Sequence, residues 1–342
     1  MESSTWAPGE FPWLAGVDVA GPSIRVIIDN DFAGDPDDLF QVAHHLMSPA
    51  VEVRGIVASH LAPGDSFDPG PHSVRHGVEK LRDLFAAMGF DGAELIWPGS
   101  ADALVSDSAP QESDAARAVV IEAMRDDPRP LYFCAGGGLT DIASAWLIEP
   151  RIAEHLTLIW IGGPEYAGPV SPGLGNPEYN LAIDVRAAQV VFNRSNLPMW
   201  QVPRDVYRQC LVSDIELRRR VGEQGRLGAF LLEAVRAVTR MMSDANSPFW
   251  AGGSRGFAGT YVLGDSPLVL LSALQSAFQP DASSSEFTVV PAPCLDDDGA
   301  YVPNPAGRPI RVYTRLDTRL MFEDLFGHLA AVARWRGAHD CG

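Results

Sequence analysis

The sequence contains few cysteines, no long apolar segment and no recognisable targeting segment. Its four cysteines lie far apart and form no C-x-x-C pair: Cys134, Cys210, Cys294 and Cys341. A zinc or redox motif is therefore not indicated, and free thiols in a reducing compartment are expected. No apolar run reaches the roughly 18 residues that a membrane span requires. The first residues lack the basic and apolar regions of a signal peptide. These absences predict a cytoplasmic protein that does not engage membranes.

Basic residues are also scarce. Lys and Arg together number 26 against 44 Asp and Glu, so the formal net charge is −18 and the pI is about 4.7. This acidity argues against nucleic acids and anionic membranes as partners, because both carry negative charge. It is compatible with a small, neutral, polyhydroxylated ligand. The length of 342 residues and the hydrophobic content of 46% predict a globular protein with a large core.

The acidic residues are concentrated at one turn near the amino terminus. Five carboxylates fall within ten residues, with no lysine or arginine among them: Asp29, Asp31, Asp35, Asp37 and Asp38. An apolar run at residues 26–28 predicts a buried strand before this turn, and a helical pattern follows it. Five acids at such a turn repel one another unless a cation is bound or some are protonated. Carboxylate oxygens suit Ca²⁺ or Mg²⁺, so the turn predicts a metal or catalytic site.

Helix capping is the alternative interpretation of the same turn. Asp35 fits the N-cap position and Pro36 the first helical position, and the next two acids would then lie in the first turn of the helix. Capping does not account for Asp29 and Asp31 at the carboxyl end of the strand. That end is where open α/β sheets bind ligands, so we favour the metal or catalytic site.

Apolar strands alternate with amphipathic helices along most of the chain. The expected strands are residues 26–28, 51–58, 95–97, 130–135, 156–161 and 198–202. This alternation predicts an α/β fold with a doubly wound, mostly parallel sheet flanked by helices. Right-handed crossovers bring the carboxyl ends of such strands to one edge. The polar and glycine residues that follow the strands should therefore meet: Asp29, Asp31, Ser59, His60, residues 136–140, Gly162 and Gly163.

The two ends of the chain differ from this pattern. Residues 1–22 are rich in Pro, Gly and Trp and predict an irregular arm, followed by one domain over residues 23–338. Near the carboxyl end, residues 287–290 and 310–313 predict a small hairpin, and residues 317–335 a closing helix. Before them, the loop at residues 243–259 has the length and composition of a lid, and its Phe249 and Trp250 either stack on a base or pack on the body.

Five segments, taken together and in this order, resemble the inosine–uridine nucleoside hydrolase family over roughly residues 24–330. The first is the acidic turn, D-x-D-x-x-G-D-x-D-D, two residues longer than in many family members. The next are G-G-L-T-D-I-A at 137–143 and I-G-G at 161–163. The last are P-E-Y-N-L-A-I-D at 177–184 and G-D-S-P-L at 264–268. They are similar to the family segments G-P-L-T-N-I-A, A-E-F-N-I-Y-V-D and H-D-P-L.

The resemblance implies an N-glycosyl hydrolase of nucleoside salvage. It implies hydrolysis of a ribonucleoside or related ribosyl compound by metal-activated water, through an oxocarbenium-like transition state. Asp31, Asp38, Asp265 and the main-chain carbonyl of Thr140 would bind Ca²⁺, and we favour Asp31 as the base that takes the proton of the water. Family members are commonly homodimers or homotetramers.

The resemblance also assigns the sugar contacts. Asp37 would meet the ribose 2′-hydroxyl, and Glu178 and Asn180 would hold the ribose hydroxyls. Without the family context, the last two residues would equally well organise a turn before a strand. Asp265, likewise, would be a plain N-cap before Pro267.

The base side of the predicted site departs from the family. Gly264 stands where many members have a histidine associated with leaving-group activation, and Ser59-His60 stands where many have asparagine. His60, Tyr261 and Arg255 are the candidates for a replacement acid. His44 and His45, on the first helix, are expected to be packing or surface residues.

The residues alone also allow two other functions. One is a ribosyl-ligand-binding homologue without turnover, which the missing histidine suggests. The other is a haloacid dehalogenase-type phosphatase, with Asp29 as nucleophile and Asp31 as acid/base. The phosphatase leaves the segments E-Y-N and G-D-S-P unexplained.

Overall fold

The structure is a computed structural model that describes residues 5–18, 20–166, 177–243, 259–276 and 284–340. Its centre is an eight-stranded sheet with the strand order β3-β2-β1-β4-β5-β6-β12-β9. Neighbouring strands are parallel, except that β9 runs antiparallel to β12. The strands are β1 (Ile24–Asn30), β2 (Val51–Ala58), β3 (Ile96–Pro98), β4 (Leu131–Ala135), β5 (Leu156–Ile161), β6 (Met199–Val202), β9 (Glu286–Pro291) and β12 (Pro309–Arg315). The predicted doubly wound, mostly parallel sheet is confirmed.

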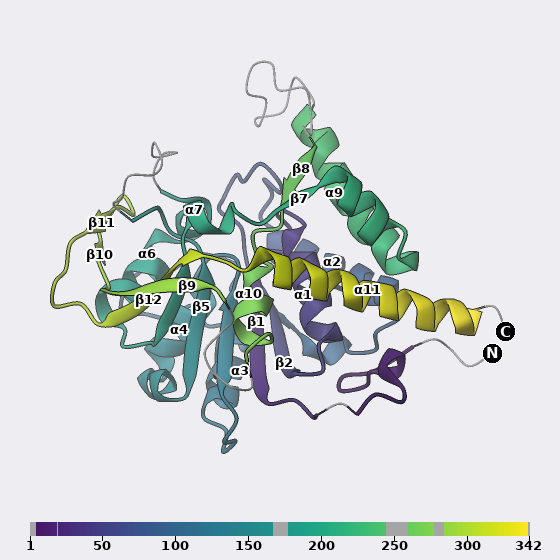
Figure 1. Ribbon diagram of the computed structural model, residues 1–342. Coiled ribbons are helices and arrows are strands. Elements are labelled where there is room, and N and C mark those ends of the chain that lie inside the picture. Colours follow the sequence, from purple (N-terminus) through teal and green to yellow (C-terminus); the bar gives the residue numbers. More distant parts are fainter. Residues whose placement is uncertain (1–4, 19, 167–176, 244–258, 277–283, 341–342) are drawn as a thin grey trace.

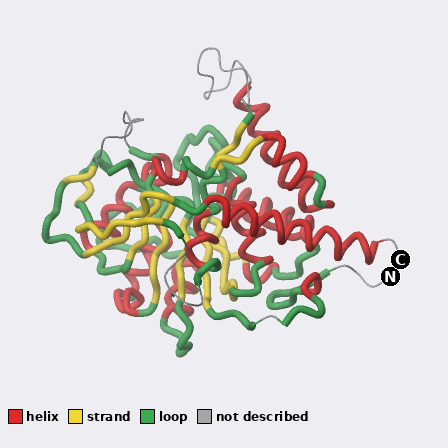
Figure 2. Tube along the Cα trace, in the orientation of Figure 1, coloured by secondary structure: helices red, strands yellow, loops and turns green. Residues whose placement is uncertain are grey.

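Helices cover both faces of this sheet (Figures 1 and 2). One face carries α1 (Asp37–Met47), α2 (Ser73–Met88), α9 (Gly225–Ser243), α10 (Pro267–Ser272) and α11 (Thr318–Asp340). The other face carries α3 (Asp114–Ala123), α4 (Thr140–Ile148), α6 (Val185–Gln189) and the π-helical turn η4 (Val190–Arg194). Short helical segments lie between them: η1 (Pro12–Leu14), η2 (Ala93–Leu95), η3 (Pro150–Glu154), α5 (Tyr179–Ile183), α7 (Arg204–Tyr207), α8 (Asp214–Glu216) and η5 (Leu217–Gly222).

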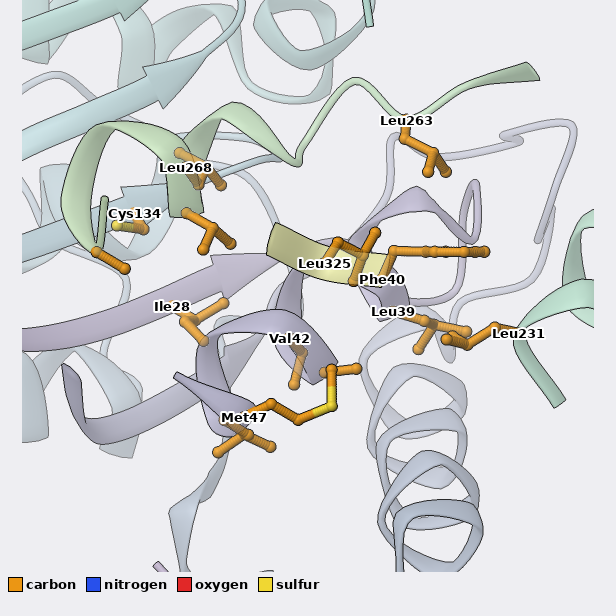
Figure 3. Packing of buried hydrophobic residues seen from close by; sticks show 14 of the residues in the cluster. Ile28, Leu39, Phe40, Val42, Met47, Cys134, Leu231, Leu263, Leu268 and Leu325 are labelled. Atoms are coloured by element: carbon orange, nitrogen blue, oxygen red, sulfur yellow. The ribbon is translucent and has the colours of Figure 1, made fainter. Parts of the chain in front are cut away.

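Because helices cover both faces of the sheet, the central strand β1 has apolar residues at consecutive positions and not only at every second one. Val26 and Ile28 of β1 belong to one core cluster and Ile27 to the other, and all three are fully buried. Figure 3 shows Ile28 in the first cluster with Phe40 of α1 and Leu268 of α10. Each such buried side chain contributes about 1.5–3 kcal/mol, so the strand is anchored from both sides.

The carboxyl-terminal segment adds two strands and a helix. β9 and β12 pair antiparallel as predicted and extend the main sheet. A second small hairpin, β10 (Cys294–Leu295) with β11 (Tyr301–Val302), encloses the acids at 296–298. A third antiparallel pair of strands is formed by β7 (Leu211–Ser213) and β8 (Thr260–Val262). The closing helix is confirmed, although it continues past the predicted end at residue 335.

The amino-terminal arm packs on the end of α2. The Trp6 indole nitrogen donates to the Met88 carbonyl at 3.1 Å, and its backbone N–H donates to the Gly89 carbonyl at 3.0 Å. The interpretation of residues 23–338 as one domain stays a prediction. Phe249, Trp250, Arg255 and most of the predicted lid lie outside the described residues. None of the helices in the described ranges is long and apolar enough to cross a membrane.

The strand register brings the predicted polar edge together. Asp29 of β1 is paired with Val57 on one side and Ala135 on the other. Beyond the strands, Gly136 donates its N–H to the Asp29 carbonyl at 2.9 Å, and Ser59 donates to the Asn30 carbonyl at 3.0 Å. The expected convergence at the carboxyl end of the sheet is confirmed.

Candidate active site

A pocket of about 320 Å³ opens at this edge of the sheet. Its acidic lining residues are Asp31, Asp35, Asp37, Glu178 and Asp265, and Asn180 and Gly136 lie beside them. Most of the predicted site residues therefore face one cavity. Asp38 and Thr140 are buried and do not line it.

The acidic turn is built as a loop before α1 and is not a helix cap. Asp31 accepts the Gly34 N–H on its carbonyl at 2.7 Å, which closes the turn. The helix begins at Asp37 with Pro36 as N-cap and without a side-chain cap bond. The alternative that places Asp35 at the N-cap is therefore wrong, and its carboxylate accepts both the Tyr261 hydroxyl and the Asp37 N–H. Likewise Asp265 is not the N-cap of α10, a position that Ser266 takes.

Burial makes the aspartates of the acidic turn, and Asp265 beside them, harder to ionise. It raises the pKa of Asp31 to about 7, a rise to which the charges of Asp65 and Asp35 add. It raises the pKa of Asp35 to about 6 against the opposing bond from Tyr261. The pKa values of three further acids also lie well above the ordinary range, through burial first and mutual repulsion second: Asp37, Asp38 and Asp265.

Several buried carboxylate oxygens have no hydrogen-bond partner among the described residues. They are Oδ2 of Asp31, both oxygens of Asp38 and both oxygens of Asp29. Burial, and next the charge of Asp141, raise the pKa of Asp29, and the nearby Ser59 hydroxyl only partly offsets this rise. Unpaired buried carboxylates are costly unless a cation or a proton compensates them. The all-oxygen donor set fits a hard cation such as Ca²⁺.

The backbone at Gly136 leaves room for this arrangement. A Cβ on Gly136 would lie 2.2 Å from Oδ2 of Asp265 and 2.4 Å from Oδ1 of Asn30. In the described ranges, no three acidic, histidine or cysteine side chains are arranged to hold a metal ion as they stand. Binding of an ion would thus require the carboxylates to move closer together. In the absence of the ion, their mutual repulsion opposes this movement.

A buried polar chain behind the cluster was not predicted from the sequence. Asn30 accepts the Gly136 N–H at 2.7 Å and donates to Gln41 at 3.1 Å. Gln41 then contacts His45, whose Nε2 pairs with the Ser272 hydroxyl at 2.8 Å. The chain links the ends of β1 and β4 to α1 and to α10, the helix that follows Asp265. His45 is therefore a packing residue, as predicted, and burial lowers its pKa to about 3.

Glu178 lines the pocket and makes several hydrogen bonds there. Its carboxylate accepts the Gly163 N–H at 2.7 Å, the Leu181 N–H at 3.1 Å and the Tyr207 hydroxyl at 2.9 Å. Glu178 is the N-cap of the short helix α5, so the alternative of a turn before a strand is wrong. Asn180 donates to the carbonyls of Gly136 and Ile161, both at 2.8 Å. Because its amide nitrogen is thus occupied, its oxygen is the group left for a ligand.

Thr140 and His60 lie behind the pocket. The Thr140 hydroxyl donates to Asp184 at 2.8 Å, so it accepts from Nε2 of His60 at 2.9 Å. The other ring nitrogen of His60 contacts the Leu61 carbonyl at 3.0 Å. With both nitrogens engaged outside the cavity, His60 is a poor leaving-group acid. The role of the Thr140 carbonyl as a metal ligand stays a prediction.

The rest of the pocket differs from its acidic part in chemistry. Aromatic and apolar side chains that the sequence did not single out line it, together with one exposed arginine: Phe67, Tyr179, Tyr207, Met242 and Arg208. Gly264 is crowded, since a Cβ there would lie 3.2 Å from Oδ2 of Asp37 and 3.3 Å from the Tyr207 ring. A histidine at this position would displace one of them.

The known proteins with similar sequences belong to one kind of enzyme. The family model described as inosine-uridine preferring nucleoside hydrolase matches residues 26–276. The chain is 33% identical over 129 residues to such a hydrolase from Leishmania major, which is 37% of this chain and 39% of that protein. It is 30% identical over 134 residues to that from Crithidia fasciculata, 38% and 40% of the two chains. The chain thus aligns with about two fifths of these relatives.

Solved structures agree on the fold. A plant nucleoside hydrolase superposes with a TM-score of 0.63 at 15% identity, covering 91% of this chain and 100% of that one. A purine-preferring ribonucleoside hydrolase from Gardnerella vaginalis gives 0.63 at 19% identity, with 91% and 99% covered. Because the family model spans well over half of the sequence, the chain belongs to the inosine-uridine preferring nucleoside hydrolase family.

Proposed function

We propose that the protein hydrolyses the N-glycosidic bond of a ribonucleoside or a related ribosyl compound with the help of Ca²⁺. The observation that carries the proposal is the set of buried carboxylates without partners, from Asp31 and Asp38, at the family's acidic segment. Acids that only cap a helix, or that form ion pairs with basic side chains, would have hydrogen-bond partners.

The proposed ligands of Ca²⁺ are Asp31, Asp38, Asp265 and the Thr140 carbonyl. When bound, the ion supplies a Lewis acid that lowers the pKa of a water and holds the ribose diol. The ion also removes the penalty that the buried carboxylates carry in its absence. Calcium is preferred to magnesium because the pocket offers many carboxylate oxygens and few constraints toward octahedral geometry.

The chain's own residues perform the other steps. Asp31 accepts the proton of the attacking water, because it lines the pocket in which this water would lie. Asp37 accepts the ribose 2′-hydroxyl, and its position is set by the Asp265 N–H, which donates to it at 3.1 Å. Glu178 and Asn180 bind the remaining ribose hydroxyls. The surrounding carboxylates stabilise the positive charge that develops on the sugar.

Departure of the base depends on a different set of groups. No histidine lines the pocket in the part of the chain that is described. Phe67 and Tyr179 form an edge-to-face pair with centroids 6.5 Å apart, and they offer stacking to the base. We therefore expect substrates whose leaving group needs little protonation to react fastest.

The phosphatase alternative is disfavoured by the site. Its nucleophile would be Asp29, which is fully buried and does not line the pocket. A nucleophile must reach the reacting atom of its substrate. Family membership of the chain removes the remaining reason to consider it.

Turnover separates the hydrolase from a homologue that only binds ribosyl ligands. Purified protein is incubated with inosine, guanosine, adenosine, uridine and cytidine in Ca²⁺, and reducing sugar is measured. Release that EDTA abolishes and added Ca²⁺ restores is expected. Nucleoside binding without ribose release across the panel would refute the hydrolase, and release unaffected by EDTA would refute the metal.

Three further properties stay predictions of the family resemblance. They are assembly as a homodimer or homotetramer, a cytoplasmic location and a role in nucleoside salvage. Gel filtration with light scattering tests the first of them directly.

A further inference from the structure

Lys80 is the only lysine in the 342 residues. It lies on α2, and its ammonium nitrogen donates to the Ala33 carbonyl at 3.2 Å and to the Gly34 carbonyl at 3.4 Å. These carbonyls belong to the acidic turn that is two residues longer than in many family members. The single lysine of the chain thus binds the backbone of its most acidic segment.

Close packing of α2 against the turn makes this contact possible. Gly77 lies three residues before Lys80, on the same face of the helix. A Cβ on Gly77 would lie 3.4 Å from Cβ of Phe32 and 3.7 Å from the Ala33 nitrogen. The helix therefore approaches the turn closely, which places Lys80 within reach of the carbonyls.

The charge of Lys80 acts on carboxylates that it does not bind. It is half-buried and forms no ion pair within 4.0 Å among the described residues. Its ammonium nevertheless lies on the carbonyls of residues 33 and 34, between Asp31 and Asp35 in the chain, so its positive charge is placed within the acidic turn. Because the ammonium binds carbonyl oxygens, the carboxylate oxygens stay available to a cation.

We propose that Lys80 is a positioning residue that holds the extended acidic turn and supplies a resident counter-charge to its carboxylates. This inference rests on the proposed metal site. Lys80 and a bound Ca²⁺ both add positive charge to the same acidic turn, so each partly replaces the other in stabilising the folded turn. Removal of the lysine should therefore cost the metal-free protein more than the calcium-bound protein.

Thermal unfolding of the full chain tests this coupling. Lys80→Met, Lys80→Arg and the control Arg82→Met, an exposed cation on the same helix, are melted in EDTA and in excess CaCl₂. We expect the Ca²⁺-induced rise in Tm to be larger in Lys80→Met than in wild type by about 3 °C. Lys80→Arg and Arg82→Met should give the wild-type rise.

The outcomes separate this inference from the proposed function. An equal loss of Tm with and without Ca²⁺ would mean that Lys80 only packs, and would overturn the proposal. A wild-type protein whose Tm ignores Ca²⁺ would refute the metal site and the coupling together.

A chemical label covers the case in which Lys80→Met does not fold. Reductive methylation with ¹³C-formaldehyde keeps the charge and marks only Lys80 and the terminal amine. The Lys80 methyl resonance should shift when Ca²⁺ is added. A resonance that stays in place at saturating Ca²⁺ would overturn the proposal.

Discussion

The two ends of β1 carry buried charge in opposite ways. At its start, Arg25 is 2% exposed and pairs with Glu122 at 2.7 Å and with Asp127 at 3.7 Å. At its end, Asp29 and Asp31 are nearly as buried, and three of their oxygens have no partner among the described residues. One strand thus joins a compensated end to an uncompensated end.

The compensated end extends into a network of ion pairs. Arg54 contacts Glu122 at 3.1 Å, and Arg129 contacts Glu52 at 2.6 Å. Burial alone would raise the pKa of Glu52, but its bonds to Arg129 and Arg54 outweigh burial and lower it. Glu52 is therefore held in its charged form by its two arginine neighbours.

The difference separates structural charge from functional charge. Where a buried charged side chain has its partner within the protein, no ligand is needed to compensate its charge, and the ion-pair network belongs to the folded structure alone. Where buried acids face one another, the folded state is penalised until a ligand compensates them. Perturbed acids of this kind are typical of functional sites, and three changes test the distinction.

The largest effect is expected for Asp38→Ala at the uncompensated end. Because Asp38 has two unpaired oxygens, its loss should abolish Ca²⁺ binding and lower kcat by about a thousandfold, the scale of several kcal/mol that a Lewis acid contributes. Circular dichroism should show an intact fold. Isothermal titration with Ca²⁺ and ribose release provide the readouts.

The matched control for this change is Asp83→Ala on the exposed side of α2. It removes a carboxylate of the same type from a solvated position, so calcium binding and turnover should match wild type. Stoichiometric calcium in Asp38→Ala would show that the site is misplaced.

A second, smaller effect is expected for Arg25→Met at the compensated end. It leaves Glu122 without its closest buried partner, so the free energy of unfolding should fall by about 3–5 kcal/mol. Urea unfolding measures this loss. Because the change lies far from the pocket, kcat per folded molecule should be unchanged, and a drop in kcat would contradict the separation of the two ends.

The smallest effect is a pH dependence that Ca²⁺ removes. Asp31 ionises near 3.8 when unfolded, whereas burial raises its folded pKa to about 7. The unfolded chain therefore loses this proton first, and the metal-free protein should lose stability as pH rises from about 4 to about 7. Melting in EDTA should show a fall of several degrees across this window. An equal fall in saturating Ca²⁺ would contradict the assignment.

Particular residues show how far sequence patterns reached. The residues that follow the strands, Asp29 and Asp31, Ser59 and His60, residues 136–140 and the glycines at 162 and 163, were enough to predict one shared edge, since strand ends in a parallel sheet must meet. The segments at 177–184 and 264–268 were connected to it only by the family resemblance. The cap assignment of Asp35 failed because Tyr261, brought in by β8, competes for its carboxylate. Local propensity cannot register a partner that comes from a distant strand.

Lys80 shows the same limit for charge. The window of five acids contains no basic residue, yet a lysine 47 residues beyond Ala33 binds that turn. Asn30 is a similar case, because a single amide next to two aspartates gives no signal until Gly136 and Gln41 surround it.

The sequence alone determined the alternation of strands and helices, the excess of acid at one turn and the family of the chain. These follow from composition and spacing, which are local properties. Only the tertiary structure decided which acids have partners, which residues line the pocket beside them and where the lysine that binds the turn lies. Burial and Coulomb interactions depend on distance through space, and a chain's neighbours in space are set by its packing.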